Sequence, residues 1–410
     1  ILFLQQKKFV VKQPIAITGI SAISALGHNP ASISRNYAQK SHFLSYKTDF
    51  QTWVGELPEA TKNQVESIRG ENRNYQELDP SVLYAIYVSR EAMKIAGWQK
   101  GDDFGINIGS SRGATQLFEK YYSAFAKDNK STTLASPTTT LGNISSWVAQ
   151  DLQNHGPEIS HSITCSTALH ALLNGVAWLQ AGMCDKFLVG GSEAALTAFT
   201  IEQMRAMKTY SRADEKSEFP CLAFDINKTE NTMVLGEGAA SVYLEVGERE
   251  NALAYVTGIG YATEKLKHAV SISAEAECFQ RSMKMAIEDA FGESHSGNAI
   301  SDFSGMSEKV DAVVMHAPGT MLGDSSEFKA IEKIFEGKFP LLTTNKWKIG
   351  HTFGASGLLS LDLAIRMLQT QEFVEVPFIS PQGKNKTLNN ILVNAVGFGG
   401  NAVSILLSKA

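Results

Sequence analysis

One cysteine, Cys165, is the residue of this chain best suited to nucleophilic chemistry. It lies between a strand-like run, Glu158–Ile163, and a helix-like run, Ala168–Gln180, in which apolar residues recur at helical spacing. We therefore expect Cys165 on the first turn of a largely buried helix, where free N–H groups and the positive end of the helix dipole favour a thiolate. Most free cysteines are small core residues, so a catalytic role needs further residues beside it.

Two histidines occupy comparable positions. His316 follows the strand-like run Ala312–Met315, and His351 comes shortly before the helix-like run Ser356–Leu368. Ligands bind at the carboxyl ends of strands in α/β sheets, and imidazole N–H groups aimed at a developing oxyanion serve enolate or acyl chemistry. A thiolate can hold an acyl group as a thioester. Together the three residues predict one site for acyl and enolate chemistry.

Two other motifs compete with this interpretation. The run Gly109–Gly113 matches the G-x-S-x-G turn of serine hydrolases, which makes Ser111 a second candidate nucleophile, with Asp324 and His351 in the expected chain order. The pattern is short, and glycine-flanked serines are common in strand–helix turns. The run Gly397–Ala402 is similar to a dinucleotide-binding fingerprint, but too few residues follow it for the helix, second strand and acidic residue that such a site needs.

Short apolar strands alternate with longer helix-like runs along the whole chain. The strands are expected at 14–19, 105–108, 186–189, 239–245, 254–257, 312–315, 391–395 and 402–407, and the helices at 81–96, 115–126, 168–180, 277–290 and 356–368. This alternation predicts α/β layering with mostly parallel sheets. The Gly/Ser-rich stretch 292–307 predicts a loop. Cys165 and His351 each open a helix rich in small residues, so we expect two related halves that meet near residue 255.

The bulk composition excludes several classes of protein. The 410 residues carry a net charge of −5, which gives the chain as a whole no electrostatic footprint for nucleic acid. No apolar run is long enough to cross a membrane. The four cysteines lack the paired spacing of a zinc site or a disulfide framework, so we expect no metal and a reducing, cytoplasmic setting.

With Cys165, His316 and His351 in this order, the chain resembles the β-ketoacyl–acyl carrier protein synthases, type II condensing enzymes of the thiolase superfamily. The similarity runs from about residue 15 to 407. The motifs that carry it are Gly156-Pro157, Thr164-Cys165-Ser166, Gly190–Ala194, His316–Glu327, Lys346 to His351 with Gly354–Gly357, and the turn Gly397–Gly400.

The resemblance implies an α/β, thiolase-like five-layer αβαβα fold made of two similar βαβαβαββ halves. Residues 1–255 would carry the cysteine together with insertions for the dimer contact and the acyl pocket. Residues 256–410 would carry both histidines. Members of this family are usually homodimers, and some specialised pathways pair the active chain with a ketosynthase-like paralogue that lacks the cysteine.

The resemblance also implies roles for individual residues. Cys165 would take an acyl chain from a carrier protein, and His316 and His351 would stabilise the enolate that forms when a malonyl thioester loses CO₂. The enolate would attack the acyl thioester and give a β-ketoacyl chain two carbons longer. Lys346 and Glu327 would form a supporting ion pair.

The turn at Phe398 and Gly399 would complete the oxyanion hole and gate access of the acyl chain. The backbone N–H of Phe398 would join that of Cys165 in the hole. No cofactor would be needed beyond the pantetheine arm of the carrier protein.

Acyl carrier protein is the implied partner. Carrier proteins are acidic, so basic residues near the site would steer their docking. The candidates are Lys127, Lys130, Arg205 and Lys208.

The chain departs from the family at several substrate-binding positions. Thr320 stands alone where two threonines are common, because Pro318 replaces the first. Val270 replaces another threonine, and Met233 stands near a usual aromatic residue. Arg112 occupies a position where the acyl pocket normally has an aliphatic side chain, and a buried charge there is costly without a partner. We expect Arg112 to narrow the pocket or to meet a polar or aromatic-ended chain.

These departures make a specialised polyene or polyketide pathway a second candidate beside fatty acid synthesis. A non-catalytic chain-length partner subunit is the alternative with the same fold, but it would need neither Cys165 nor the histidines. A degradative thiolase would need a second cysteine near the C-terminal glycine turn, where this chain has none. The Ser111 hydrolase remains the alternative from a different fold.

Overall fold

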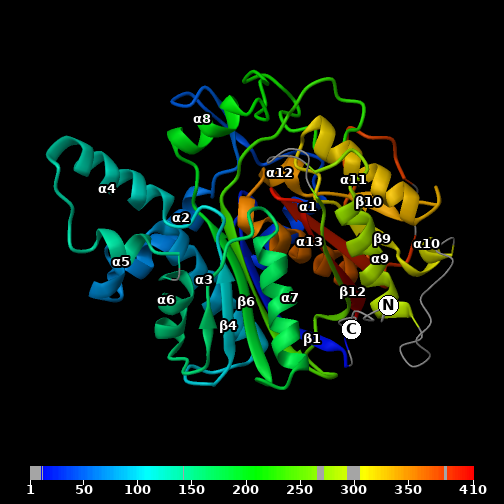
Figure 1. Ribbon diagram of the computed structural model, residues 1–410, viewed down its shortest axis with the longest axis horizontal. Helices are drawn as coiled ribbons and strands as arrows, with labels where there is room; N and C mark the ends of the chain where they lie inside the picture. The colour runs from blue at the N-terminus through cyan, green and yellow to red at the C-terminus, as the bar shows by residue number, and fades with distance from the viewer. Residues whose placement is uncertain (1–10, 12, 142, 266–271, 293–304, 383–385) are drawn as a thin grey trace, which may run out of the picture.

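The computed structural model describes residue 11 and residues 13–141, 143–265, 272–292, 305–382 and 386–410. Within these residues the chain builds one large twisted sheet with helices on both sides (Figure 1). No helix in this part of the chain is long and apolar enough to span a membrane.

The first half of the chain supplies five neighbouring strands of the sheet. They are β1 (Ile15–Ile23), β4 (Gly105–Gly109), β5 (Glu158–Ile159), β6 (Lys186–Glu193) and β7 (Gly238–Val246). Their spatial order is β1-β7-β6-β4-β5. β7 is antiparallel to both β1 and β6, whereas β6, β4 and β5 are parallel.

The second half repeats this arrangement. Its strands are β8 (Ala254–Thr263), β9 (Ala312–Val314), β10 (Leu341–Thr343), β11 (Asn390–Gly397) and β12 (Asn401–Lys409). Their order is β8-β12-β11-β9-β10, with β12 antiparallel to both neighbours and the last three parallel. Strand order and direction are therefore the same in both halves, which meet where β1 pairs antiparallel with β8. The exact boundary at residue 255 stays a prediction.

Helices α7 (Thr167–Gln180) and α13 (Ser356–Thr370) form the middle layer between the halves. They contact each other, and each packs on strands of both halves. The outer layers contain α3 (Pro80–Ala96) and α6 (Asn143–Leu152) on one side and α9 (Glu277–Phe291) and α11 (Met321–Ile334) on the other. Two helical layers outside and one between two halves of sheet give the predicted five-layer α/β architecture.

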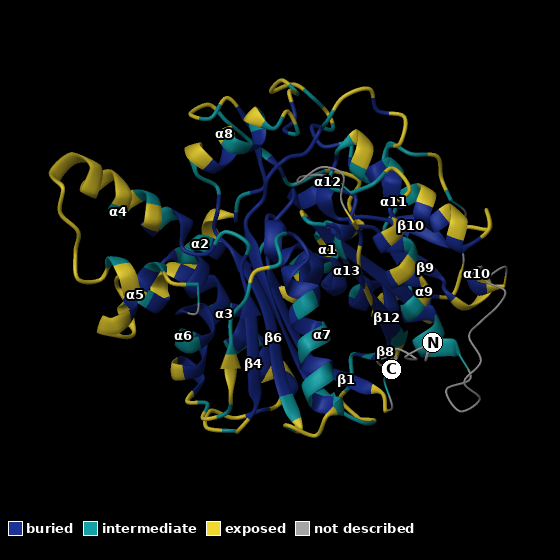
Figure 2. Cartoon of the chain, in the orientation of Figure 1, coloured by how far each residue is buried: buried dark blue, intermediate teal, exposed yellow. Residues whose placement is uncertain are grey.

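Side-chain alternation explains why the strands are buried on both faces. In β6, Phe187 and Val189 join the core cluster around the two middle helices, and Leu188 joins the cluster around α3. Successive strand residues point to opposite faces, so a continuous apolar run is required wherever helices cover both. Figure 2 shows β4 and β6 buried over most of their length.

The remaining elements lie around this core. They are α1 (Pro30–Ala38), β2 (Ser45–Lys47), β3 (Thr52–Val54), α2 (Glu59–Glu66), α4 (Thr115–Asp128), α5 (Ala135–Thr139), α8 (Ala198–Ala206), α10 (Met306–Lys309) and α12 (Lys346–Ile349). Helices α4 and α5 form an arm that projects from the body (Figure 1). The arm exposes large apolar side chains, among them Phe118, Tyr122 and Phe125.

The prediction of mostly parallel sheets is wrong. The sheet is mixed, because β7 and β12 each run antiparallel to both of their neighbours and β1 pairs antiparallel with β8.

Two further predictions, for local structure, need correction. The strand expected over Glu158–Ile163 ends at Ile159, because the backbone beyond it turns toward side chains instead of a neighbouring strand: the N–H of Ile163 donates to Thr167 Oγ1 at 2.8 Å. Most of the loop expected at 292–307 lies outside the described residues, and its described end begins α10 at Met306.

Candidate active site

Cys165 lies in a tight turn immediately before α7. The helix begins at Thr167 with Ser166 as its N-cap, so the cysteine precedes the first helical turn instead of lying on it as predicted. Thr164 adopts a left-handed φ of 46°, and its hydroxyl donates to the carbonyl of Phe398 at 3.3 Å. This contact joins the cysteine turn to the turn between β11 and β12.

The thiol of Cys165 is buried, with 6% of its surface exposed. Burial, with the nearby carboxylate of Glu193, raises the pKa of Cys165 to about 12, although the charge of Lys346 opposes the shift. Desolvation of the sulfur therefore opposes the helix dipole and favours the neutral thiol. The sulfur needs a proton acceptor when it attacks a substrate.

His316 is held by its backbone. It follows β9, and its N–H donates to Glu327 Oε1 at 2.9 Å, while the N–H of Ala317 donates to Oε2 at 2.8 Å. Asn394 donates to Oε1 of the same carboxylate at 3.1 Å. One buried glutamate thereby fixes the whole turn. Nδ1 of the imidazole is buried and has no hydrogen-bond partner among the residues that the structure describes.

His351 follows α12 and pairs with the segment before β7. Its N–H donates to the carbonyl of Val234 at 2.7 Å, and its Nδ1 lies 2.9 Å from the hydroxyl of Ser356. When that hydroxyl donates to Nδ1, the proton of the neutral ring is on Nε2. The His316 and His351 rings are 5.4 Å apart at 87°, so the structure brings both imidazoles together.

Both histidines are neutral in this environment. Burial is the main cause, and the positive charge of Lys346 contributes: the pKa of His316 falls well below its usual range, and that of His351 falls to about 3. A neutral imidazole has one N–H donor and one free nitrogen. The pair can thus donate to a substrate oxygen or accept a proton.

Lys346 and Glu327 are both fully buried and lie close enough to influence each other. Burial lowers the pKa of Lys346 and raises that of Glu327, and each charge opposes the shift of the other. Among the described residues no nitrogen–oxygen contact within 4.0 Å joins them. The predicted direct ion pair is wrong in this geometry, because the oxygens of Glu327 accept from backbone N–H groups and from Asn394.

A cavity of about 300 Å³ brings these groups to one space. Cys165, His316 and His351 line it together with Met233, Thr320 and Phe398. Its other walls are mostly apolar and come from both halves, including Met204, Met207, Ile272, Pro318, Leu322, Phe353 and Val396. Cysteine and histidines from different halves thus face one chamber, as the sequence predicts.

The turn after β11 closes one side of the chamber. Phe398 is 41% exposed at the cavity wall, and Gly399 and Gly400 follow it with φ of 100° and 68°. A Cβ on Gly397 would lie 1.9 Å from Thr164 Oγ1, so only glycine allows this turn to approach the cysteine turn.

Comparison with known sequences assigns the chain to a family. The β-ketoacyl synthase N-terminal domain matches residues 12–250, and the β-ketoacyl synthase C-terminal domain matches residues 253–377. The chain belongs to the β-ketoacyl synthase family. A similar protein, 3-oxoacyl-[acyl-carrier-protein] synthase 2 of Coxiella burnetii, is 26% identical, with 97% of this chain and 99% of the relative covered.

Solved structures of ketosynthases share the fold. A β-ketoacyl synthase from Burkholderia phymatum superposes with a TM-score of 0.82 at 18% identity, covering 97% of this chain and 100% of the other. A type II polyketide ketosynthase, solved in complex with its acyl-carrier protein and bound to a hexaketide, gives 0.81 at 17% identity over 97% and 100%. The thiolase-like fold class is confirmed.

Arg112 lies beside the ketosynthase chamber but does not line it. Its guanidinium donates to Thr200 Oγ1 at 3.3 Å and to Gln203 Oε1, both on α8, and its Cζ lies 5.8 Å from the ring centre of Phe353. Phe353 in turn stacks on His351 with ring centres 5.8 Å apart. Among the described residues no carboxylate lies within 4.0 Å of this guanidinium.

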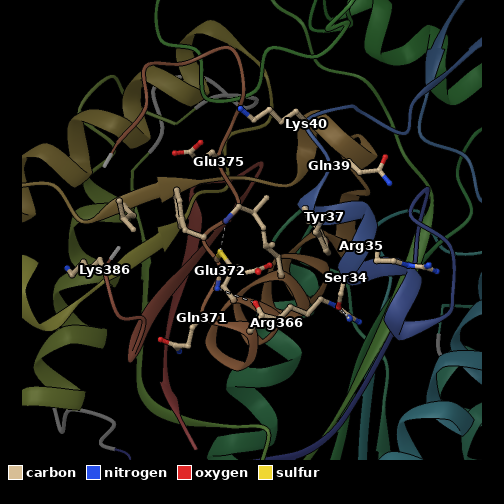
Figure 3. A pocket seen from close by; sticks show the side chains of 17 residues that line it. Ser34, Arg35, Tyr37, Gln39, Lys40, Arg366, Gln371, Glu372, Glu375 and Lys386 are labelled. Carbon is tan, nitrogen blue, oxygen red and sulfur yellow. Dashed lines mark hydrogen bonds between the residues drawn. The ribbon is translucent and has the colours of Figure 1, made fainter. Parts of the chain in front are cut away.

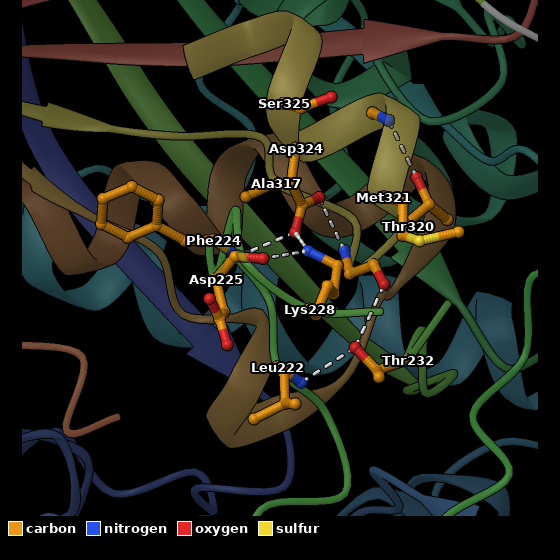
Figure 4. A network of polar contacts seen from close by, with 12 residues as sticks. Leu222, Phe224, Asp225, Lys228, Thr232, Ala317, Thr320, Met321, Asp324 and Ser325 are labelled. Atoms are coloured by element: carbon orange, nitrogen blue, oxygen red, sulfur yellow. Dashed lines mark hydrogen bonds and ion pairs between the residues drawn. The ribbon is translucent and has the colours of Figure 1, made fainter. Parts of the chain in front are cut away.

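The segment before β7 is fastened to the His316 turn by a buried ion pair (Figure 4). Lys228 Nζ lies 2.6 Å from Asp324 Oδ2, and both side chains are almost fully buried. Asp324 also accepts from the N–H groups of Phe224 and Gly319 at 2.8 and 3.0 Å. Asp324 is therefore occupied in positioning this turn. The Ser111–Asp324–His351 hydrolase triad is wrong, since His351 Nδ1 contacts Ser356 instead.

The predicted docking residues fall into two groups. Arg205, at the end of α8, donates to the backbone carbonyls of Phe50 and Gln51, the second at 3.2 Å. Together with Lys208 it lines a hollow of about 710 Å³. Lys127 and Lys130 are exposed on and after α4, a separate element (Figure 1). Val270 lies outside the described residues.

A second cavity, of about 600 Å³, has neither cysteine nor histidine among its described lining residues (Figure 3). It lies between α1 and the end of α13. Arg366 in its wall is already bonded to Asp362 at 2.8 Å and to Ser34 Oγ at 2.8 Å. This cavity is separate from the three reacting side chains.

Sequence reasoning assigned no role to Glu193 and Phe353, which lie directly against the site. Glu193 is the last residue of β6 and is fully buried. A glutamate at the carboxyl end of an otherwise apolar strand was the available signal. Phe353 has a left-handed φ of 43°, which the sequence does not reveal.

Proposed function

We propose that this chain is a decarboxylating condensing enzyme that joins an acyl group on Cys165 to a malonyl unit carried by acyl carrier protein. The observation that carries the proposal is a single chamber lined by Cys165 from the first half and by two neutral imidazoles, His316 and His351, from the second half. A nucleophile that holds an acyl group and two donors for an enolate oxygen are what this reaction requires.

The first step is transfer of the acyl group. The sulfur of Cys165 attacks the thioester carbon and forms a new carbon–sulfur bond, and the pantetheine sulfur leaves as a thiol. A neutral imidazole takes the cysteine proton and returns it to the leaving sulfur. The N–H groups of Cys165 and Phe398 hold the oxyanion. Their turns are in contact through Thr164, which supports this arrangement.

The second step forms the carbon–carbon bond. The malonyl thioester loses CO₂, and the electron pair of the broken bond becomes an enolate, whose oxygen accepts from His316 and His351. The enolate carbon attacks the carbonyl carbon of the Cys165 thioester, the carbon–sulfur bond breaks, and the cysteine sulfur leaves and takes up a proton from solvent. The product is a β-ketoacyl thioester. Glu327 positions His316 through the backbone, and Lys346 supplies positive charge to the chamber.

The chain length of the acyl group depends on Arg112 and Phe353. Together they form a wall behind His351, and the guanidinium on its far side is hydrogen-bonded to α8 but has no carboxylate partner among the described residues. This arrangement supports a short acyl chain or one with a polar or aromatic end. Arg112→Leu should extend the range of accepted apolar chains. An acyl-Cys165 complex whose chain passes Arg112 in an apolar tunnel would refute this role.

The carrier protein docks beside α8, where Arg205 and Lys208 share one hollow. Thr320 and Met233 line the chamber and contact the pantetheine arm. The exposed aromatic residues of the α4–α5 arm, Phe118 and Tyr122, bind a second subunit. A second copy of this chain is the proposed subunit, and a ketosynthase-like paralogue is the alternative.

The test is mass spectrometry of the protein after incubation with a panel of acyl carrier proteins. We expect an acyl adduct on Cys165 that is absent from Cys165→Ala and unchanged in Ser111→Ala. Cys221→Ala is the matched control, because Cys221 is equally buried but outside the chamber. An adduct lost only in Ser111→Ala, or no adduct with any carrier, would overturn the proposal.

A further inference from the structure

Glu193 is a buried carboxylate that connects the two sides of the chamber. It ends β6, and its side chain accepts from the backbone N–H groups of Ser111 and, at 3.3 Å, of Arg112 in the loop after β4. The same carboxylate accepts from the N–H of Gly354 at 3.0 Å, three residues after His351. The loop that carries Arg112 and the turn that carries His351 are therefore bound to one side chain.

The two segments have no room to move independently. A Cβ on Gly354 would lie 2.6 Å from Glu193 Oε1 and 2.7 Å from the backbone nitrogen of Ser111. Phe353, between His351 and Gly354, has the Arg112 guanidinium 5.8 Å from its ring centre. A shift of Arg112 thus displaces groups that touch the His351 turn through Glu193 and through Phe353.

The carboxylate is satisfied by backbone donors instead of a cation. Among the described residues no lysine or arginine nitrogen lies within 4.0 Å of it, and its side chain is fully buried. Burial raises the pKa of Glu193 to about 7, against the effect of the N–H donors. Burying a carboxylate without a counter-ion lowers the stability of the fold. In return, this carboxylate holds two loops of the site together.

We propose that Glu193 is a positioning residue that fixes the Arg112 loop and the His351 turn to each other, so that acyl-chain recognition and malonyl decarboxylation depend on the same carboxylate. This inference rests on the proposed condensing activity. It explains why the acyl end of the site, in the first half, and the enolate end, in the second half, form one rigid unit.

The experiment measures the two half-reactions separately in the full chain. Acyl loading of Cys165 is followed by intact mass over a panel of acyl carrier proteins of increasing chain length, and CO₂ release from malonyl carrier protein gives kcat and KM. The variants are Glu193→Gln, which keeps the shape but removes the charge, and Gly354→Ala, whose added methyl group crowds both Glu193 and the backbone of Ser111.

We expect each variant to change both readouts: a shifted chain-length preference in loading, and a kcat for CO₂ release at least about 10-fold lower at unchanged KM. Asp289→Asn is the matched control. Asp289 is a half-buried carboxylate that also accepts two backbone N–H groups, from Val11 and Ile259, but it lies on α9, outside the chamber. It should change neither readout.

The proposal is overturned if Gly354→Ala slows CO₂ release but leaves the loading preference unchanged, because the loops are then uncoupled. An equal effect of Asp289→Asn would overturn it as well, because the defect would then be general. If Glu193→Gln does not fold, the other two variants test the proposal. Gly354→Ala must then change the chain-length preference in acyl loading, and Arg112→Leu must change the kcat for CO₂ release. Failure of the unmodified chain to load any acyl group would instead refute the proposed function.

Discussion

The two halves of this protein share one strand order but contribute different chemistry. In the first half the third strand, β5, leads to Cys165 and the buried helix α7. In the second half the third strand, β10, leads to Lys346, His351 and the buried helix α13. Equivalent positions thus hold the nucleophile in one half and an imidazole in the other. The repeated scaffold brings these two unlike groups to one chamber because α7 and α13, which follow them, both begin near the middle of the molecule.

The halves also differ in how a buried carboxylate is used. Glu327 holds the His316 turn of its own half through two backbone N–H groups. Glu193 binds backbone N–H groups from both halves. The second half therefore positions its catalytic turn internally, and the first half provides the connection between them. Lys346, a buried lysine that lowers the pKa of both histidines, also belongs to the second half.

The largest effect in this comparison should come from removing that cation. Lys346→Met should slow CO₂ release from malonyl carrier protein about 100-fold while acyl loading persists, because the enolate loses a buried positive charge. Lys348→Met is the matched variant on the same helix. Lys348 donates to the carbonyls of Asn36, Gln39 and Ser41, so its loss should instead lower the free energy of unfolding by about 1–3 kcal/mol.

Steady-state kinetics and chemical denaturation of both variants separate these outcomes. If Lys346→Met lowers only stability, or Lys348→Met lowers kcat as strongly at full folding, the division of roles between the two lysines is incorrect.

A smaller effect is expected on the pH profile. Burial lowers the pKa of Lys346, so activity should fall as the pH rises through that lowered value and the ammonium loses its proton. In the same window the unfolded chain binds more protons than the folded chain, so the free energy of unfolding should rise with pH. Lys346→Arg should keep its charge and move the alkaline loss of activity to higher pH.

Measuring kcat and urea unfolding over the same pH range tests whether activity falls while the free energy of unfolding rises. Activity and stability that fall together with rising pH would assign the transition to another group.

Much of the fold and the reacting residues could be predicted from the sequence because their signals are local. The helices expected at 81–96, 168–180 and 356–368 match α3, α7 and α13 closely, since apolar spacing determines them. The protonation state of Cys165 could not be predicted, because desolvation depends on what the whole fold packs around the sulfur. The contacts of Glu193 join residues 82 and 161 positions away and left no pattern in the sequence.

The smallest effect should distinguish the two groups of basic residues. Reversing charge with Arg205→Glu and Lys208→Glu should raise KM for malonyl carrier protein several-fold, and more at low salt, because surface charge steers docking. The same changes at Lys127 and Lys130 on the α4 arm should matter less, since these residues lie on a separate element. Equal effects at both places would extend the docking surface across the arm.

The most direct test of the account is a single turnover by protein whose Cys165 already carries an acyl group. With malonyl carrier protein, the unmodified chain should release CO₂ and form β-ketoacyl product. His351→Ala should keep the acyl group on Cys165 and form product at least about 100-fold more slowly. His170→Ala, at a half-buried histidine on α7 outside the chamber, should behave like the unmodified chain. Normal product formation by His351→Ala would contradict the shared chamber as the site of carbon–carbon bond formation.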